Sequence, residues 1–410
     1  MSNQGVAVTA AAMAAPPATL PWSTTWGLTA GVCAVGSEAL LISPVLKDIA
    51  ADFALNPAEI GLAVTIYGIA LAVVAPFAGL ISDRLSRKRA LRLGLIVFSL
   101  AGFAAALSTS FTMLLIARAV CAMGAALFLP SSYAYVGDEV PFERRAQVMG
   151  RVMFGWAGSM VLGVPLGGVL SQWVGWRGAL AALALLGLVV LLALWRLQSR
   201  HQPNTAPGAL RKLTGNFLKL LTNRTIQLLL LVNLLNMFSF YGVYTYLGTA
   251  LRDELHIGGG GAAVFAAFYG IGLGITTANG KIADRIGKPR ALTLALLVLA
   301  AILSALPSAT HHAVSLAAVM FVWGLSQGMV MVSLPSIVTE QSSELRGSVT
   351  SLLSCTTYIG VTLGSWVMGL VFIGIGYQPV GFGCGTASLL AALIFLYLRR
   401  QKGARMPSIG

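Results

Sequence analysis

Two charged residues, Glu38 and Arg118, lie inside long apolar stretches of the sequence, AVGSEALLISPVLKDIAADF and LLIARAVCAMGAAL. A charge at the centre of a membrane-spanning helix costs on the order of 2.5–3.5 kcal/mol. If the two stretches form helices that run in opposite directions, both side chains lie roughly 9 to 12 Å below the same surface, at about 1.5 Å per residue. This shared depth permits an ion pair, which would offset part of each cost.

An ion pair of this kind has the chemistry of a proton switch. Burial favours the neutral form of a carboxylic acid, whereas a neighbouring guanidinium favours the anion. If Glu38 contacts Arg118 in one conformation and loses it in another, proton binding becomes tied to conformation. The alternative interpretation is a static pair that only fixes the register of two helices.

Two further apolar stretches carry polar and aromatic residues at spacings of three and four. In the seventh stretch these residues are Asn233, Asn236, Phe240 and Tyr244, with Tyr241 beside them. In the tenth stretch they are Met320, Trp323, Gln327 and Met331. Aromatic faces and flexible methionines suit ligands of variable shape, and a few amides fix orientation, so both stripes are candidate substrate contacts. Plain packing between helices is the alternative for each stripe.

The elements that position these residues are expected to be membrane-spanning helices. The chain is 57% hydrophobic and only 10% charged over 410 residues, which is too few charges to cover a soluble domain. Apolar stretches of about 18 or more residues are typical of spanning helices, because lipid offers the backbone no hydrogen-bond partners. About twelve are expected, near residues 26–46, 59–81, 90–108, 112–135, 147–170, 177–196, 225–250, 261–282, 290–307, 313–336, 347–374 and 378–398.

The net charge of +14 is explained by topology rather than by nucleic-acid binding. With both termini in the cytoplasm, the 27 Lys and Arg residues all fall in cytoplasmic segments except Lys47, Arg118, Arg177 and Arg252. This asymmetry follows the positive-inside rule and predicts that both termini are cytoplasmic. We expect an integral plasma membrane protein, in a bacterial inner membrane, whose partners are the lipid bilayer, a small-molecule substrate and the proton.

Neither a metal site nor a disulfide framework is predicted. The four cysteines lie singly in apolar stretches, and the four histidines lie in loops or at helix ends. The chain shows no Walker loop and no set of nucleophile and base, so we expect no enzyme and no cofactor, with a proton gradient as the energy source. A monomer suffices if the two halves described next complete one cavity.

A repeat divides the chain into two halves. Residues 79–91 read GLISDRLSRKRAL and residues 280–292 read GKIADRIGKPRAL, and seven of the thirteen positions are identical. Each copy lies between the second and third spans of its half. We therefore predict a disordered cytoplasmic tail at residues 1–25, a six-helix bundle at 26–196, a cytoplasmic linker at 197–224, a second six-helix bundle at 225–398 and a basic tail at 399–410.

The repeated segment resembles the loop between spans two and three of the major facilitator superfamily. The matching positions are Gly79, Asp83, Arg84, Arg87, Lys88 and Arg89, with Ser86 where Gly is usual, and in the second copy Gly280, Asp284, Arg285, Gly287, Lys288 and Arg290. The resemblance covers nearly the whole chain. It implies an all-α integral membrane fold of twelve transmembrane helices in two pseudo-symmetric bundles, which expose a central site to alternate sides. It also implies that these residues form a cytoplasmic latch, for which a solvated basic loop is the alternative.

The fifth expected span, GWAGSMVLGVPLGG, is similar to the glycine-rich pattern of proton antiporters in this superfamily. Its small residues and proline are Gly155, Gly158, Gly163, Pro165, Gly167 and Gly168. Small residues let helices pack backbone to backbone, and a proline removes one internal hydrogen bond. Generic helix packing explains the glycines, but it does not explain a proline that the second half replaces with Trp366.

Glu38 and Arg118 also resemble the embedded acid and arginine of the drug and sugar efflux branch. This resemblance implies a proton-coupled antiporter that exports a small neutral or amphipathic molecule, such as a drug, a sugar or a nucleoside-like compound. A proton-coupled uptake symporter for a nutrient or metabolite is the alternative within the same fold. A membrane sensor or scaffold that transports nothing is the alternative from another class.

Overall fold

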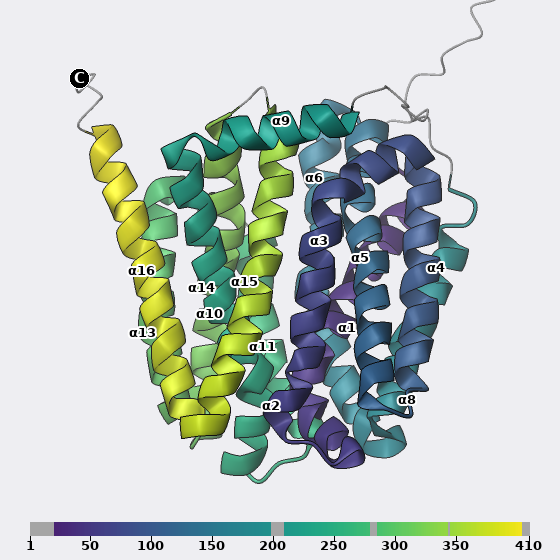
Figure 1. Ribbon diagram of the computed structural model, residues 1–410, viewed down its shortest axis with the longest axis vertical. Helices are drawn as coiled ribbons and strands as arrows, with labels where there is room; N and C mark the ends of the chain where they lie inside the picture. Colours follow the sequence, from purple (N-terminus) through teal and green to yellow (C-terminus); the bar gives the residue numbers. More distant parts are fainter. Residues whose placement is uncertain (1–19, 198–208, 279–284, 343–344, 404–410) are drawn as a thin grey trace, which may run out of the picture.

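The computed structural model describes residues 20–197, 209–278, 285–342 and 345–403 (Figure 1). The first half of the chain contains α1 (Trp22–Phe53), α2 (Pro57–Ile60), α3 (Leu62–Leu85), α4 (Arg87–Ala106), α5 (Phe111–Glu139), α6 (Phe142–Met153), α7 (Gly155–Gly158), the π-helix η1 (Ser159–Gly163) and α8 (Val164–Ala193). After α9 (Ala209–Leu221), the second half contains α10 (Arg224–Glu254), α11 (Gly259–Ala278), α13 (Lys288–Ala309), α14 (Ala313–Glu340), α15 (Arg346–Ile375) and α16 (Tyr377–Gly403). The predicted all-α membrane fold is confirmed.

Eleven helical stretches of the described residues are long and apolar enough to cross a membrane. One of them, Gln147–Ala193, has 47 residues, more than twice the roughly 20 that one crossing needs. Gly175 interrupts this stretch with φ 74° and ψ 168°, a backbone conformation that glycine adopts without strain. Two crossings joined at Gly175 make the count consistent with the twelve predicted spans.

The backbone itself repeats between the two halves. Residues with positive φ occur in three pairs at nearly constant separation: Ala54 with His256, Ser86 with Gly287, and Gly175 with Gly376. Each pair marks the same place in its half, namely the ends of the first span, the start of the third span and the junction of the last two. The duplication predicted from one sequence motif therefore extends over the described backbone.

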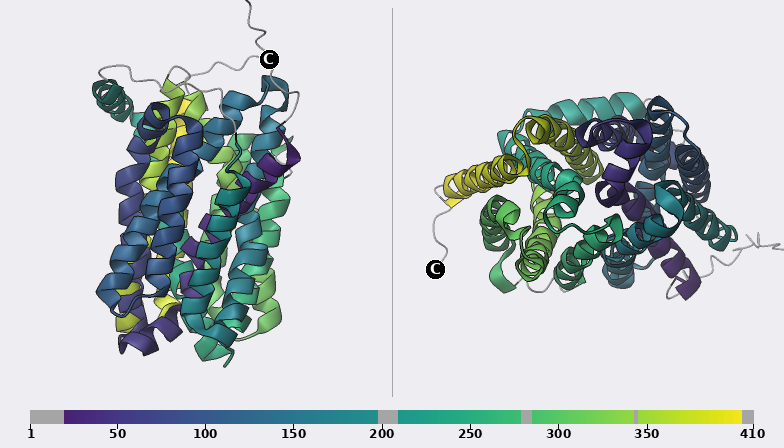
Figure 2. Two further views of the ribbon diagram at one scale, coloured as in Figure 1. Left: turned by 90° about the vertical axis from the view of Figure 1, so that its right-hand side faces the viewer. Right: turned by 90° about the horizontal axis from the view of Figure 1, so that it is seen from below.

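The spanning helices of the two halves pack side by side, and α9 runs across their direction at one end (Figure 1). We call this the linker end, and the opposite end, where α2 lies, the far end. The two halves of the chain meet along two seams, α3 against α15 and α8 against α11 (Figure 2). A third contact joins α1 to α10.

Candidate functional site

Glu38 and Arg118 form a buried ion pair between α1 and α5, so the predicted contact is confirmed. Arg118 is fully buried and Glu38 is 2% exposed. The guanidinium also donates to the backbone carbonyl of Glu38 at 3.2 Å and to that of Ala63 at 3.4 Å. Burial of both charges requires such additional hydrogen bonds, because each ion has lost its water.

Tyr67 of α3 covers this ion pair. Its ring centroid lies 4.4 Å from the guanidinium carbon of Arg118, a cation–π contact. Each of the three residues has one buried polar atom without a hydrogen-bond partner, namely Oε2 of Glu38, Nη2 of Arg118 and the hydroxyl of Tyr67. Tyr67 also lines a small cavity whose walls include Trp156, Tyr241 and Tyr358.

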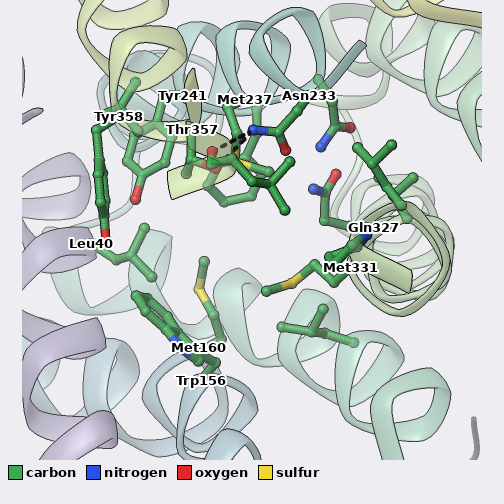
Figure 3. A pocket seen from close by; sticks show the side chains of 18 of the residues that line it. Leu40, Trp156, Met160, Asn233, Met237, Tyr241, Gln327, Met331, Thr357 and Tyr358 are labelled. Atoms are coloured by element: carbon green, nitrogen blue, oxygen red, sulfur yellow. Dashed lines mark hydrogen bonds between the residues drawn. The ribbon is translucent and has the colours of Figure 1, made fainter. Parts of the chain in front are cut away.

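A larger central cavity shares these same aromatic residues and encloses about 1000 Å³, including its open mouth (Figure 3). Its walls come from both halves of the chain, with Leu40 and Met160 from the first, and with Asn233, Gln327 and Tyr358 from the second. None of the described residues that line it is charged. Tyr67 therefore stands between a buried ion pair and a neutral cavity of ligand size.

Six of the nine predicted substrate contacts line this cavity: Asn233, Asn236, Phe240, Tyr241, Gln327 and Met331. Asn233 is held in place by α15, because its amide nitrogen donates to the carbonyl of Leu353 at 3.0 Å and to the hydroxyls of Thr356 and Thr357. Its oxygen points toward the interior of the cavity (Figure 3). Asn236 is 1% exposed, and neither atom of its carboxamide has a protein partner.

The other three, Tyr244, Met320 and Trp323, do not line the cavity in this conformation, and their role as substrate contacts stays a prediction. Tyr244 stacks on Phe240 with centroids 5.4 Å apart, and Trp323 packs on the same ring at 5.3 Å. Met320 and Trp323 are fully buried. These residues lie on the predicted helix faces but nearer the far end, where the helices close together.

Several lining residues were absent from the predicted set. Trp156 and Met160 belong to the glycine-rich segment, and Tyr358 and Thr357 belong to α15. Three further methionines, Met153, Met160 and Met237, contribute flexible apolar surface. The sequence could have indicated Trp156, because it is a large aromatic residue within a segment of mostly small residues.

The glycines of the fifth span pack this helix against its neighbours. Gly158, Gly163 and Gly167 face Cys33, Ser37 and Leu41 of α1, and Gly168 faces Ala263 of α11. Added side chains would collide at most of these positions. The chain widens into the π-helix η1 directly before Pro165, which has no N–H to donate and whose ring would crowd the preceding turn. The motif therefore has a structural basis in two places, against α1 within the first half and against α11 at the seam between the halves.

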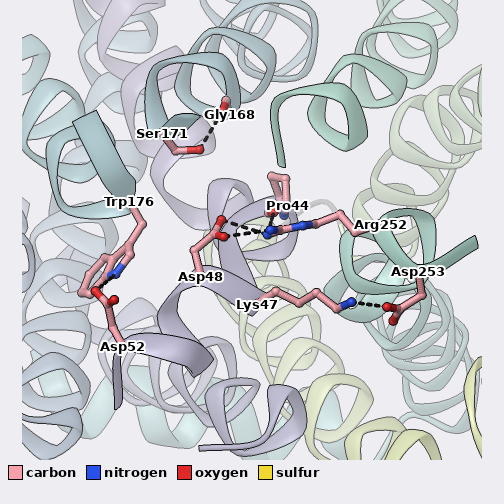
Figure 4. Close-up of polar contacts among 9 residues, drawn as sticks. All are labelled: Pro44, Lys47, Asp48, Asp52, Gly168, Ser171, Trp176, Arg252 and Asp253. Carbon is pink, nitrogen blue, oxygen red and sulfur yellow. Dashed lines mark hydrogen bonds and ion pairs between the residues drawn. The ribbon is translucent and has the colours of Figure 1, made fainter. Parts of the chain in front are cut away.

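Crossed ion pairs join α1 to α10 at the far end (Figure 4). Arg252 donates to both carboxylate oxygens of Asp48 at 2.8 Å each. Lys47 pairs with Asp253 beside it. Each helix thus supplies one basic and one acidic residue in sequence, and each charge finds its opposite on the other helix.

The backbones of α1 and α10 touch at the same level. The amide of Gly248 donates to the hydroxyl of Ser43 at 3.2 Å, and this hydroxyl donates to the carbonyl of Tyr244 at 2.5 Å. A Cβ at position 248 would lie 2.6 Å from the carbonyl carbon of Ser43, so only glycine permits this approach. The far end is closed, and the cavity extends from there toward the linker end.

The predicted latch residues are only partly described. Gly280 and Asp284 lie outside the described residues, as do the side-chain surroundings of Gly79 and Asp83. Arg84, Arg89, Arg285 and Arg290 are exposed, and Lys88 is half-buried. Arg87 donates to Asp138 of α5 at 2.8 Å, and Lys288 donates to Glu340 of α14 at 3.0 Å. Both contacts stay within one half, so neither closes the linker end in this conformation.

Comparison with known proteins decides the family. The sequence pattern of the Major Facilitator Superfamily matches residues 27–357. The chain belongs to the major facilitator superfamily. As a major facilitator it is an integral membrane transporter that needs no enzymatic chemistry, and its two-bundle architecture is that of the family.

Relatives of this major facilitator include two proteins of Bacillus subtilis (strain 168). It is 35% identical over 378 residues to the uncharacterized MFS-type transporter YwfA, with 92% of each chain covered. It is 25% identical over 340 residues to the uncharacterized MFS-type transporter YceJ, with 82% of this chain and 86% of the relative covered. In fold it is similar to a bacterial homolog of the human lysosomal transporter Spinster, crystallised in an inward-facing and unoccupied conformation. The TM-score is 0.73 at 19% identity, over 96% of this chain and 100% of the homolog.

Proposed function

We propose that this transporter is a proton-coupled antiporter that exports a small neutral or amphipathic molecule by alternating access. Drugs, sugars and nucleoside-like compounds are the candidate substrates. The observation that carries the proposal is the buried Glu38–Arg118 pair beside an uncharged cavity. Inward proton movement supplies about 2.3 kcal/mol per charge per 100 mV, in addition to any pH gradient.

The ion pair is built so that Glu38 can be neutralised at limited cost. A proton on Oε2 of Glu38 would leave Oε1 facing Arg118. The guanidinium would keep two backbone carbonyls and the ring of Tyr67 as partners. Loss of the carboxylate charge leaves the Arg118 charge uncompensated, but these carbonyls and the aromatic ring still supply it with acceptors, which offsets part of the penalty of breaking a buried pair.

Tyr67 offers a route by which the cavity and the ion pair can affect each other. The small cavity beside Tyr67 and the central cavity share Trp156, Tyr241 and Tyr358. A substrate that moves these aromatic side chains would also change the space around Tyr67, and thereby its contact with Arg118. In this way substrate binding and proton binding could compete, as antiport requires.

The chemistry of the central cavity favours uncharged substrates. Its described lining offers amides, hydroxyls, aromatic faces and thioethers, but no carboxylate or cation to neutralise a charged ligand. A desolvated ion there would lack a partner. We place the linker end in the cytoplasm, on the positive-inside pattern of the sequence, so this conformation presents the cavity to the cytoplasm.

The coupling role of Glu38 is tested in reconstituted vesicles. A screen of drug susceptibility and metabolite retention in cells with and without the protein supplies the substrate. Glu38→Gln should lose substrate movement driven by a pH gradient while keeping downhill exchange. Glu59→Gln, at the cap of α2 away from the ion pair, is the matched control. Full pH-driven transport by Glu38→Gln would contradict the proposal.

The direction of transport separates export from uptake. A pH gradient that is acidic at the far end should drive substrate out through that end. Movement of substrate in the same direction as the proton would instead identify a symporter with the same fold. Absence of any flux in the vesicles would favour a sensor or scaffold.

A further inference from the structure

Helix α9 is an element that the transport cycle proposed above does not use. It runs across the direction of the spans and lies along the outer edge of the bundle, outside the ring of spanning helices in both perpendicular views (Figure 2). It packs against α15 and α10 of the second half. A helix at this place lies at the periphery of the protein, away from the central cavity.

One face of α9 packs against the rest of the protein. Leu220 is buried, and Phe217 packs against the core. Asn216 donates to the hydroxyl of Ser348 in the first turn of α15 at 3.2 Å. Successive residues of a helix are separated by about 100°, so these three side chains lie within one sector of roughly that width.

The apolar surface of α9 is wider than the face that the protein covers. Leu218 is 69% exposed and Leu221 is 42% exposed. Leu221 lies about 40° around the helix from Phe217, and Leu218 about 100°, both on the same side. Two large leucines thus extend the buried face in one direction, where the described residues leave most of Leu218 and much of Leu221 exposed.

The remaining sector of α9 is basic. Arg211 and Lys219 are exposed, and they flank the exposed Gly215. The surface of α9 therefore has three successive sectors around the helix axis: one packs against the protein, the next carries exposed leucines, and the last carries exposed basic residues. This order is expected of a helix that lies in the membrane interface with its apolar side toward the acyl chains and its basic side toward the headgroups.

We propose that α9 is an interfacial helix that docks on anionic lipid. Leu218 and Leu221 insert at the boundary of the acyl chains, and Arg211 and Lys219 bind the headgroup phosphates. Since Asn216 of α9 is hydrogen-bonded to Ser348 in the first turn of α15, the lipid surface becomes an anchor for the start of α15. This inference does not depend on the substrate or on proton coupling.

The insertion is tested by fluorescence in lipid nanodiscs. A chain with its four cysteines replaced by alanine carries one environment-sensitive label, at Leu218→Cys or at Gly215→Cys. Position 215 is the matched control, because it lies on the basic side and a Cβ there would meet no atom within 4 Å. Spin-labelled lipid should quench the label at 218 more strongly, and aqueous iodide should quench the label at 215 more strongly. Equal access of iodide to both positions would overturn the proposal.

The headgroup specificity is tested with the label at position 218 in nanodiscs made with and without phosphatidylglycerol. Phosphatidylglycerol should increase lipid quenching, and the double variant R211Q/K219Q should abolish this increase. Each removed charge is expected to lower the ratio of docked to undocked helix about fivefold. The double variant in pure phosphatidylcholine controls for misfolding. An undiminished phosphatidylglycerol effect in the double variant would overturn the assignment of Arg211 and Lys219.

Discussion

Asp48 of α1 and Arg252 of α10 form a two-point ion pair that joins the two halves of the chain at the far end. The neighbouring pair of Lys47 and Asp253 runs in the opposite direction between the same helices. Beneath them, Gly248 brings the two backbones into contact. The structure is therefore held closed at one end by contacts that must break when the cavity opens to that side.

We expect Asp48→Asn to favour the conformation in which the far end is open. The substitution removes a charge-assisted, two-point contact worth about 1–2 kcal/mol at this partly exposed position, so the open population should rise roughly tenfold. The measurement is labelling of Met160→Cys in the cavity by an impermeant maleimide added from the far-end side. The background chain lacks its four native cysteines.

The exchanged pair Asp48→Arg with Arg252→Asp is the control for the role of this ion pair in closing the far end. It restores opposite charges across the two helices, so labelling should return toward the level of the parent chain. Equal labelling of the parent, the single variant and the exchanged pair would show that the ion pair does not hold the far end closed.

Removal of one partner of the Glu38–Arg118 pair should harm stability more than removal of both. Arg118→Met leaves the carboxylate of Glu38 buried without its cation, at a cost of about 3–5 kcal/mol. The double variant E38Q/R118M replaces the pair by neutral groups and should recover much of this loss. Thermal inactivation in detergent measures both. A double variant less stable than Arg118→Met would contradict the expectation.

The sequence predicted the spans, the duplication and the ion pair because each depends on local or pairwise signals. Long apolar stretches report helices whatever their packing, and the depth of a charge along a helix follows from its position in the stretch. Glu38 and Arg118 had few alternatives, since a buried charge needs an opposite charge. The pairing was therefore predicted from the free-energy cost of burying a single charge, without information on which helices are neighbours.

The boundaries of the cavity could not be predicted in the same way. Asn236 and Tyr244 lie on one face of α10, but only Asn236 reaches the cavity. Tyr244 lies two turns closer to the far end, where its carbonyl accepts a hydrogen bond from Ser43. Periodicity identifies a helix face, whereas the open part of that face depends on which end of the transporter is closed.

Ser86 and Gly287 occupy equivalent turns with the same positive-φ backbone. Replacing Ser86 with Gly and replacing Gly287 with Ser should therefore change the stability of the protein in opposite directions. Ser86 has φ 77° and ψ 145°, and Gly287 has φ 87° and ψ 123°. A side chain in this region carries strain of about 1–3 kcal/mol. Ser86→Gly should therefore stabilise the protein by about 1 kcal/mol after the entropic cost of glycine, and Gly287→Ser should destabilise it. Half-lives at a fixed elevated temperature measure both, and a change of the same sign would contradict the interpretation.

Substitutions of Asn236 and Asn233 should have different effects on thermal stability, although both should reduce transport. The carboxamide of Asn236 is buried without a protein partner, a state that costs about 1–3 kcal/mol, so Asn236→Leu should raise thermal stability while transport falls. Asn233 donates to three acceptors on α15, so Asn233→Leu should lower both. Thermal inactivation and vesicle transport of the two variants provide the comparison. If Asn236→Leu transported normally, Asn236 would be a packing residue. Its carboxamide would then not contribute to substrate selection.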